Sequence, residues 1–170
     1  MIDIYIIRHG QAEAHCSIDA ERKLTERGVN ETRKTASWLA GKLLAKQPVT
    51  PLSLLSINSP YIRAAQTAEI IVNSLEAEQK ATSIKQIVTD DLIPTASPEL
   101  AYDYITALVD THQVDHVIVV SHMPLVTFLT ECFTLGVTSP LFMTASCAHV
   151  RYDMANMRGV FEEMVSPDDL

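Results

Sequence analysis

The stretch that decides the fold is His-Val-Ile-Val-Val-Ser-His-Met-Pro, residues 116–124. Its four consecutive β-branched residues, 117–120, predict a strand that is buried on both faces, as central strands of parallel sheets are. Polar Ser121-His122 ends the strand, and a helical pattern follows with apolar residues at Leu125, Leu129 and Phe133. A buried strand that leads directly into an amphipathic helix is typical of the α/β class.

The same alternation of strand and helix extends outward from this stretch in both directions. Strands are predicted over residues 2–7, 52–57, 84–88, 146–153 and 158–165. Helices are predicted over residues 25–47 and 60–80, and a third helix after residue 98 carries Leu100, Tyr104 and Leu108 on one face. This order predicts an α/β three-layer sandwich with a mostly parallel sheet, without large insertions, in a single domain over residues 1–170.

Composition excludes several classes of protein. The 170 residues are 47% apolar and 20% charged, which argues against disorder. The net charge of −8 and the lack of any Lys/Arg block argue against a nucleic-acid or anionic membrane surface. Three widely spaced cysteines do not form a disulfide framework, and neither a spanning apolar run nor a signal peptide is visible. We therefore expect a cytoplasmic protein.

Polar residues follow the carboxyl ends of three predicted strands. They are Arg8-His9-Gly10, Ser59-Pro60 with Arg63, and Ser121-His122. Ligands of open α/β sheets bind outside these ends, so Arg8, His9, Arg63 and His122 are expected to converge. Two guanidiniums and two imidazoles near helix N-termini predict an anion site, for which phosphate is the best geometric match.

The chemistry of such a site follows from the residue types. A neutral imidazole is a nucleophile for phosphorus, and nearby arginines lower its pKa and keep its lone pair free. The same arginines stabilise the negative charge on the oxygens of a transferring phosphoryl group. A second histidine can donate a hydrogen bond to another phosphoryl oxygen, and Gly10 is expected to let the backbone turn tightly behind His9.

Four ordered motifs resemble those of the histidine phosphatase superfamily, also called the phosphoglycerate mutase-like fold. Arg8-His9-Gly10 matches its signature triplet, and Lys23-Leu24-Thr25-Glu26-Arg27-Gly28 resembles its Leu-Thr-x-x-Gly helix start. Residues 58–68, Asn-Ser-Pro-Tyr-Ile-Arg-Ala-Ala-Gln-Thr-Ala, match the second block, and residues 119–124, Val-Val-Ser-His-Met-Pro, match the third. Within the superfamily the chain most resembles the small bacterial phosphohistidine phosphatases, which lack the insertions that cover sugar-phosphate sites.

The resemblance implies a role for each site residue. His9 would accept the phosphoryl group, Arg8, Arg63 and His122 would complete the phosphate pocket, and Arg22 would add an outer substrate contact. Asp91 aligns with the general acid of the mutases. No cluster of metal-ligand residues is visible in the sequence, so we expect no metal and no cofactor. We also expect a monomer, and the resemblance implies an enzyme of two-component signalling. Its partner would be a histidine-phosphorylated protein, namely a phosphotransfer domain, with neither nucleic acid nor a membrane as partner.

The nature of the leaving group also favours phosphohistidine as the substrate. Imidazole leaves readily, since its conjugate acid has a pKa near ~6.5, whereas an alkoxide needs a well-placed general acid. Two alternatives stay open: a small-molecule phosphomonoesterase of the same superfamily and a non-hydrolytic phosphohistidine-binding module. His15-Cys16 and Arg22 also fit the His-Cys-x5-Arg pattern of cysteine phosphatases, but Asp19 and Glu21 inside that loop would repel a phosphate dianion.

Overall fold

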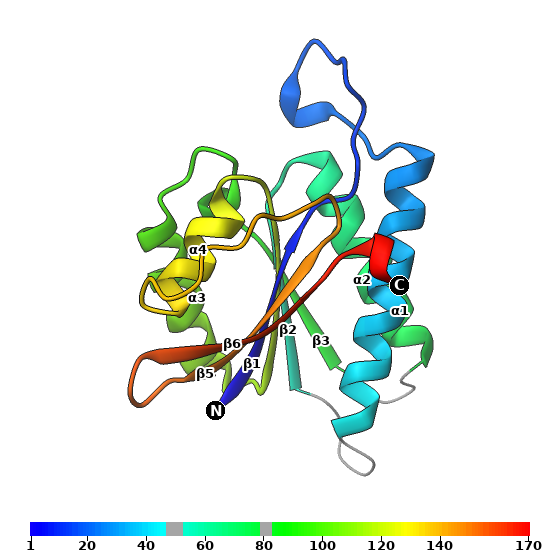
Figure 1. Ribbon diagram of the computed structural model, residues 1–170. Helices are drawn as coiled ribbons and strands as arrows, with labels where there is room; N and C mark the ends of the chain where they lie inside the picture. The colour runs from blue at the N-terminus through cyan, green and yellow to red at the C-terminus, as the bar shows by residue number, and fades with distance from the viewer. Residues whose placement is uncertain (47–52, 79–82) are drawn as a thin grey trace.

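The computed structural model describes residues 1–46, 53–78 and 83–170 of the chain (Figure 1). The strands are β1 (Ile2–Arg8), β2 (Ser53–Asn58), β3 (Ser83–Val88), β4 (His116–Ser121), β5 (Cys147–Asp153) and β6 (Arg158–Val165). The α-helices are α1 (Glu26–Lys46), α2 (Ile62–Glu78), α3 (Pro98–His112) and α4 (Leu125–Phe133). Short 3₁₀ helices are η1 (Asp19–Glu21), η2 (Asp90–Leu92) and η3 (Pro167–Asp169). The strand–helix alternation predicted from the sequence is confirmed.

The described strands form a six-stranded sheet in the order β3-β2-β4-β1-β5-β6. Strands β3, β2, β4 and β1 are parallel, and β5 and β6 continue the sheet antiparallel. The register pairs Arg8 of β1 with Ser121 of β4 and Asn58 of β2 with Val120 of β4. The carboxyl ends of β1, β2 and β4 therefore lie side by side along one side of the sheet, as the sequence predicts.

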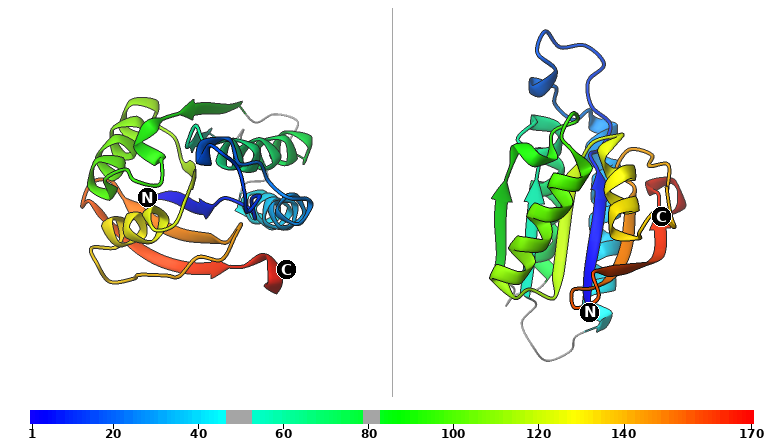
Figure 2. Two further views of the ribbon diagram at one scale, coloured as in Figure 1. Left: turned by 90° about the horizontal axis from the view of Figure 1, so that it is seen from above. Right: turned by 90° about the vertical axis from the view of Figure 1, so that its left-hand side faces the viewer.

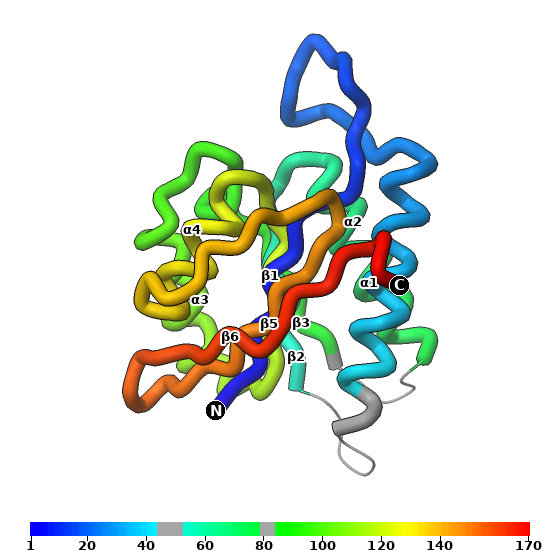
Figure 3. Tube along the Cα trace, viewed as in Figure 1, coloured from blue at the N-terminus to red at the C-terminus, as the bar shows by residue number. Residues whose placement is uncertain are grey.

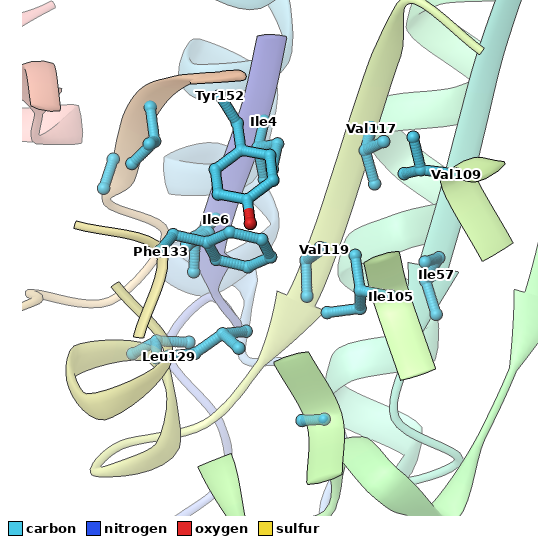
Figure 4. Packing of buried hydrophobic residues seen from close by; sticks show 14 of the residues in the cluster. Ile4, Ile6, Ile57, Ile105, Val109, Val117, Val119, Leu129, Phe133 and Tyr152 are labelled. Atoms are coloured by element: carbon cyan, nitrogen blue, oxygen red, sulfur yellow. The ribbon is translucent and has the colours of Figure 1, made fainter. Parts of the chain in front are cut away.

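Helices cover both faces of the sheet, so the fold has three layers (Figure 2). Helices α1 and α2 pack on one face over a core that includes Tyr5, Ile7 and Ile118. Helices α3 and α4 pack on the other face, where Phe133 and Tyr152 meet edge to face with ring centroids 5.1 Å apart (Figure 4). The three-layer α/β prediction is confirmed, with the mostly parallel sheet at its centre.

Two local predictions are wrong. Helix α2 begins at Ile62 rather than at Pro60, because the carbonyl of Tyr61 accepts the first helical bonds, from the Ala64 and Ala65 amides. The buried face of α3 is lined by Ala101, Ile105 and Val109, whereas Leu100 is 63% exposed. The predicted strand start at residue 52 and helix ends at residues 47 and 80 lie outside the described residues.

Gly10 and Gly28 bring the backbone after β1 against the start of α1. A Cβ on Gly28 would lie 2.0 Å from the Gln11 carbonyl oxygen, and one on Gly10 would lie 2.5 Å from the Gly28 oxygen. Among the described residues the glycine with a positive φ is Gly136, so Gly10 does not have the backbone conformation that favours glycine in a tight turn. Glycine is needed at position 10 because two backbone segments approach closely there, and not for the tight turn expected from the sequence. This contact fixes the chain that follows His9.

Replacing Gly28 with alanine is therefore expected to destabilise the protein by about 1–3 kcal/mol, because backbone atoms must move to admit the methyl group. Gly41, on the same helix, has nothing within 4 Å of an added Cβ. Gly41→Ala is expected to stabilise the protein by about 0.5–1 kcal/mol, since it only raises helix propensity. Urea unfolding of the two variants measures both effects. Equal changes in the free energy of unfolding would contradict the close approach.

Candidate active site

Four side chains converge at the carboxyl edge of the parallel strands. His9 follows β1, Ser59 follows β2, Arg63 lies in the first turn of α2, and His122 follows β4. The segment 11–25, between β1 and α1, projects beyond this edge (Figures 1 and 3). Backbone bonds join the ends: the His9 amide donates to the Ser121 carbonyl and the Ser59 amide donates to the Val120 carbonyl. His9, Arg63 and His122, which the sequence predicts to converge, lie next to one another in the structure.

His9 is held as one tautomer. Its Nδ1 lies 2.7 Å from the Gly10 carbonyl oxygen, which only accepts, so Nδ1 carries the proton. The Nε–H of Arg63 donates to Nε2 of His9 at 3.2 Å. The lone pair of Nε2 therefore points at a guanidinium, where an incoming anion would also bind. Gly10 is itself fixed to α2, because its amide donates to Thr67 Oγ1 at 3.1 Å.

The surroundings keep His9 uncharged at neutral pH. Burial, and to a smaller extent the charges of Arg63, Arg8 and Arg22, lower its pKa to about 4, against the opposing effect of the bond to Gly10. The side chain is 8% exposed. A neutral imidazole with Nε2 unprotonated is the state that nucleophilic attack requires.

His122 lies beside His9, with ring centroids 5.0 Å apart. Its Nε2 is 2.9 Å from the hydroxyl oxygen of Ser59, and its Nδ1 is buried without a hydrogen-bond partner among the described residues. Burial, together with the charges of His9 and Arg63, lowers the pKa of His122 to about 3. The hydroxyl of Ser59 also accepts from the Tyr61 amide, so it connects His122 to the chain just before α2.

Arg8 reaches the site from β1 with part of its donor capacity unused. One terminal nitrogen donates to the Phe142 carbonyl at 2.8 Å, while its buried Nε lacks a partner in the described part of the chain. The charge of Arg8 lowers the pKa of both His9 and His122. A buried N–H donor that is left unsatisfied beside two imidazoles is suited to bind an oxygen of an anion.

Arg63 is buried, 4% exposed, and binds two elements at once. Its Nε faces His9, while its terminal nitrogens donate to Asp19 of η1, to the carbonyl oxygen at 2.6 Å and to Oδ2 at 3.0 Å. Arg22 donates to the other carboxylate oxygen of Asp19 at 3.0 Å and to the Glu13 carbonyl. Arg22, predicted as an outer contact, thus reaches the site through Asp19, a residue that the sequence singled out only as repulsive.

Asp91 and Cys16 do not join this cluster. The Asp91 carboxylate, in η2, accepts from the Thr89 hydroxyl at 2.9 Å, and within the described chain it makes no bond to the two arginines or two histidines. Cys16 is exposed, and Arg22 of its motif is bonded to Asp19 and Glu13. Across residues 1–46, 53–78 and 83–170, no group of three or more His, Cys, Asp or Glu side chains is arranged to hold a metal ion. No described helix is long and apolar enough to cross a membrane.

Comparisons of the sequence give consistent matches. A model described as the histidine phosphatase superfamily (branch 1) matches residues 4–85. The chain is 32% identical over 169 residues to the phosphohistidine phosphatase SixA of Escherichia coli (strain K12), covering 99% of this chain and 96% of that protein.

Comparisons of the structure agree. The chain is similar to the protein histidine phosphatase SixA complexed with tungstate, with a TM-score of 0.81, 32% identity and 99% of each chain covered. A phosphoglycerate mutase from Bacillus anthracis shares the fold, with a TM-score of 0.65 at 18% identity, covering 99% of this chain and 94% of that one.

Proposed function

The chain belongs to the histidine phosphatase superfamily, and on this premise we propose that it is a phosphohistidine phosphatase that hydrolyses phosphohistidine on signalling proteins through an intermediate on His9. The observation that carries the proposal is the state of His9. Its Nδ1 proton is held by the Gly10 carbonyl and its Nε2 lone pair lies 3.2 Å from Nε of the buried Arg63. Similarity to SixA over almost the whole chain supports the choice of substrate.

The first step transfers the phosphoryl group. The lone pair of His9 Nε2 attacks phosphorus while the P–N bond to the substrate imidazole breaks and its electron pair goes to the departing nitrogen. With its other nitrogen protonated, the substrate imidazole leaves as a neutral molecule. Arg8 and Arg63 stabilise the phosphoryl oxygens, and the linked pair of His122 Nε2 and the Ser59 hydroxyl offers one further donor.

The second step releases phosphate. Water attacks phosphorus on the opposite side, the P–N bond to His9 breaks, and the lone pair returns to Nε2. The proton lost by water goes to phosphate or to solvent, so the enzyme returns to its starting state. Because the same donors surround the phosphoryl group in both steps, one pocket serves both.

The test is incubation with several phosphotransfer domains labelled with ³²P on histidine. We expect continuous release of inorganic phosphate, with and without chelator, and slow turnover of phosphoserine and sugar phosphates. Label that moves to the protein without release would indicate a binding or phosphotransfer module. Preference for a sugar phosphate over every phosphotransfer domain would indicate a small-molecule phosphatase.

Asp91→Asn is expected to leave phosphohistidine turnover within about twofold of the parent, because a neutral imidazole needs no general acid to leave. The same variant is expected to slow phenyl or alkyl phosphates, whose leaving oxygens are strongly basic, by about tenfold or more if Asp91 protonates those oxygens. Asp90→Asn, an exposed neighbour in η2, is the matched control. A large loss on phosphohistidine with none on the ester would refute the leaving-group argument.

A further inference from the structure

We propose that Asp19 is a positioning residue that holds the guanidinium of Arg63 toward His9, and that Arg22 acts through Asp19 instead of binding the phosphoryl group itself. This inference rests on the proposed function for the identity of the reacting group. The juxtaposition behind it is a carboxylate from the projecting segment 11–25 that bridges two arginines at the edge of the site.

Arg63 is bound from two sides. Its Nε–H points to His9 Nε2, and Asp19 holds both terminal nitrogens from the far end of the guanidinium plane. Each terminal nitrogen has two N–H groups, so each keeps one donor after bonding Asp19. These bonds keep the planar guanidinium of Arg63 from rotating, and its remaining N–H groups can still donate to phosphoryl oxygens. Asp19 can stay in place when an anion binds.

The Asp19 carboxylate is itself held firmly for an exposed side chain. Its Oδ1 accepts from Arg22 and its Oδ2 accepts from Arg63, both at 3.0 Å. These two arginines hold the pKa of Asp19 below its usual range. Arg22 also donates to the Glu13 carbonyl, and the Glu13 amide donates to the Lys23 carbonyl. These bonds join the two strands of chain that form the projecting segment, and they hold Asp19 against Arg63.

The charges at the site fit a dianion with Asp19 included. The three arginines Arg8, Arg22 and Arg63 together with Asp19 leave two positive charges, which balance the two negative charges of an unprotonated phosphoryl group. Simple Coulomb attraction predicts that removing the Asp19 charge tightens anion binding. If Asp19 holds Arg63 in place, removing Asp19 lets the guanidinium move, which predicts weaker binding of a transition-state mimic. A small misplacement of a catalytic group is enough to lose much of its stabilising effect. The two effects have opposite signs, so one measurement separates them.

The experiment measures orthovanadate affinity by calorimetry for the parent, Asp19→Ala, Asp19→Asn and Glu21→Ala. We expect about tenfold weaker binding for Asp19→Ala. Asp19→Asn is expected to weaken binding as well, because its amide NH₂ must face one of the two guanidiniums. Glu21→Ala removes the same charge from the same turn without touching either bridge, so its affinity is expected to change less than about twofold. Thermal melts confirm that each variant is folded.

Unchanged or tighter vanadate binding by Asp19→Ala would overturn the proposal. In turnover of phosphohistidine, kcat is expected to fall more than KM rises, which loss of anion attraction alone would not cause. The loss in Asp19→Ala/Arg22→Ala is expected to equal the larger single loss, whereas additive losses would mean that Arg22 acts independently. Vanadate binding needs no substrate. An inactive parent would therefore refute the proposed function, while the calorimetry would still decide the role of Asp19.

Discussion

Replacing His9 with alanine is expected to abolish phosphate release and formation of any covalent phosphoenzyme, a loss of about 10⁴-fold or more in turnover. The substitution removes the imidazole lone pair that faces Nε of Arg63. His122 is not expected to replace it as the nucleophile, because its Nε2 is bonded to the Ser59 hydroxyl. Arg8, Arg63 and His122 remain, so the variant is still expected to bind vanadate. Binding without turnover would separate the nucleophile from the anion pocket.

The measurement is rapid-quench labelling with a ³²P-phosphohistidine domain, followed by mapping of the labelled residue. In the parent the label is expected on His9 and to be acid-labile and base-stable, as a phosphoramidate is. His15→Ala and Cys16→Ser are the matched controls, because both side chains are exposed on the projecting segment. Label on Cys16, or an active His9→Ala beside an inactive Cys16→Ser, would favour the cysteine mechanism.

The fold and the convergence of the main site residues could be predicted because both depend on short-range patterns. A run such as residues 117–120 fixes a buried strand, and polar residues directly after such strands must lie at one edge of a parallel sheet. His9, Arg63 and His122 each lie within a few residues of a strand end. Their positions therefore follow from topology without knowledge of any loop.

Asp19 could not be assigned in the same way. It lies in an irregular segment, and its bond to Arg63 depends on how the segment folds back, which periodicity does not specify. Seen as part of a linear motif, a carboxylate near a phosphate is repulsive. In three dimensions it binds the far end of a guanidinium. The sign of its effect depends on that geometry.

Several motif residues were matched by resemblance, and the structure gives their physical reasons. The Leu24 amide donates to Gln66 Oε1 at 2.8 Å, which links the start of α1 to α2. Thr67 accepts from the amide next to His9. These side chains do not need to touch the reacting group, because they fix the backbone that carries it. A half-buried contact of 2.7 Å between Asp3 of β1 and His149 of β5 is likewise not predictable from strand periodicity.

Arg63→Ala is expected to lower phosphohistidine turnover by about 10²-fold or more, because a charge-assisted donor at the transferring phosphoryl group is lost. Arg63→Lys is expected to recover little of it, since an ammonium cannot bond His9 and Asp19 with one rigid fork. Arg22→Ala is expected to cost about tenfold, as its guanidinium reaches the site through Asp19.

Arg27 provides the control for net charge, because its side chain is 65% exposed and pairs with Glu31 on α1. Steady-state kinetics on one phosphotransfer domain compares the alanine variants of Arg27, Arg22 and Arg63, with urea unfolding to confirm stability. If charge alone attracted the substrate, the three variants would lose similar amounts and salt would mask the differences. If the rigid geometry of a buried arginine is what stabilises the transition state, the losses increase from Arg27 to Arg22 to Arg63 and persist at high salt. Equal, small losses for Arg22 and Arg63 would contradict the proposed pocket.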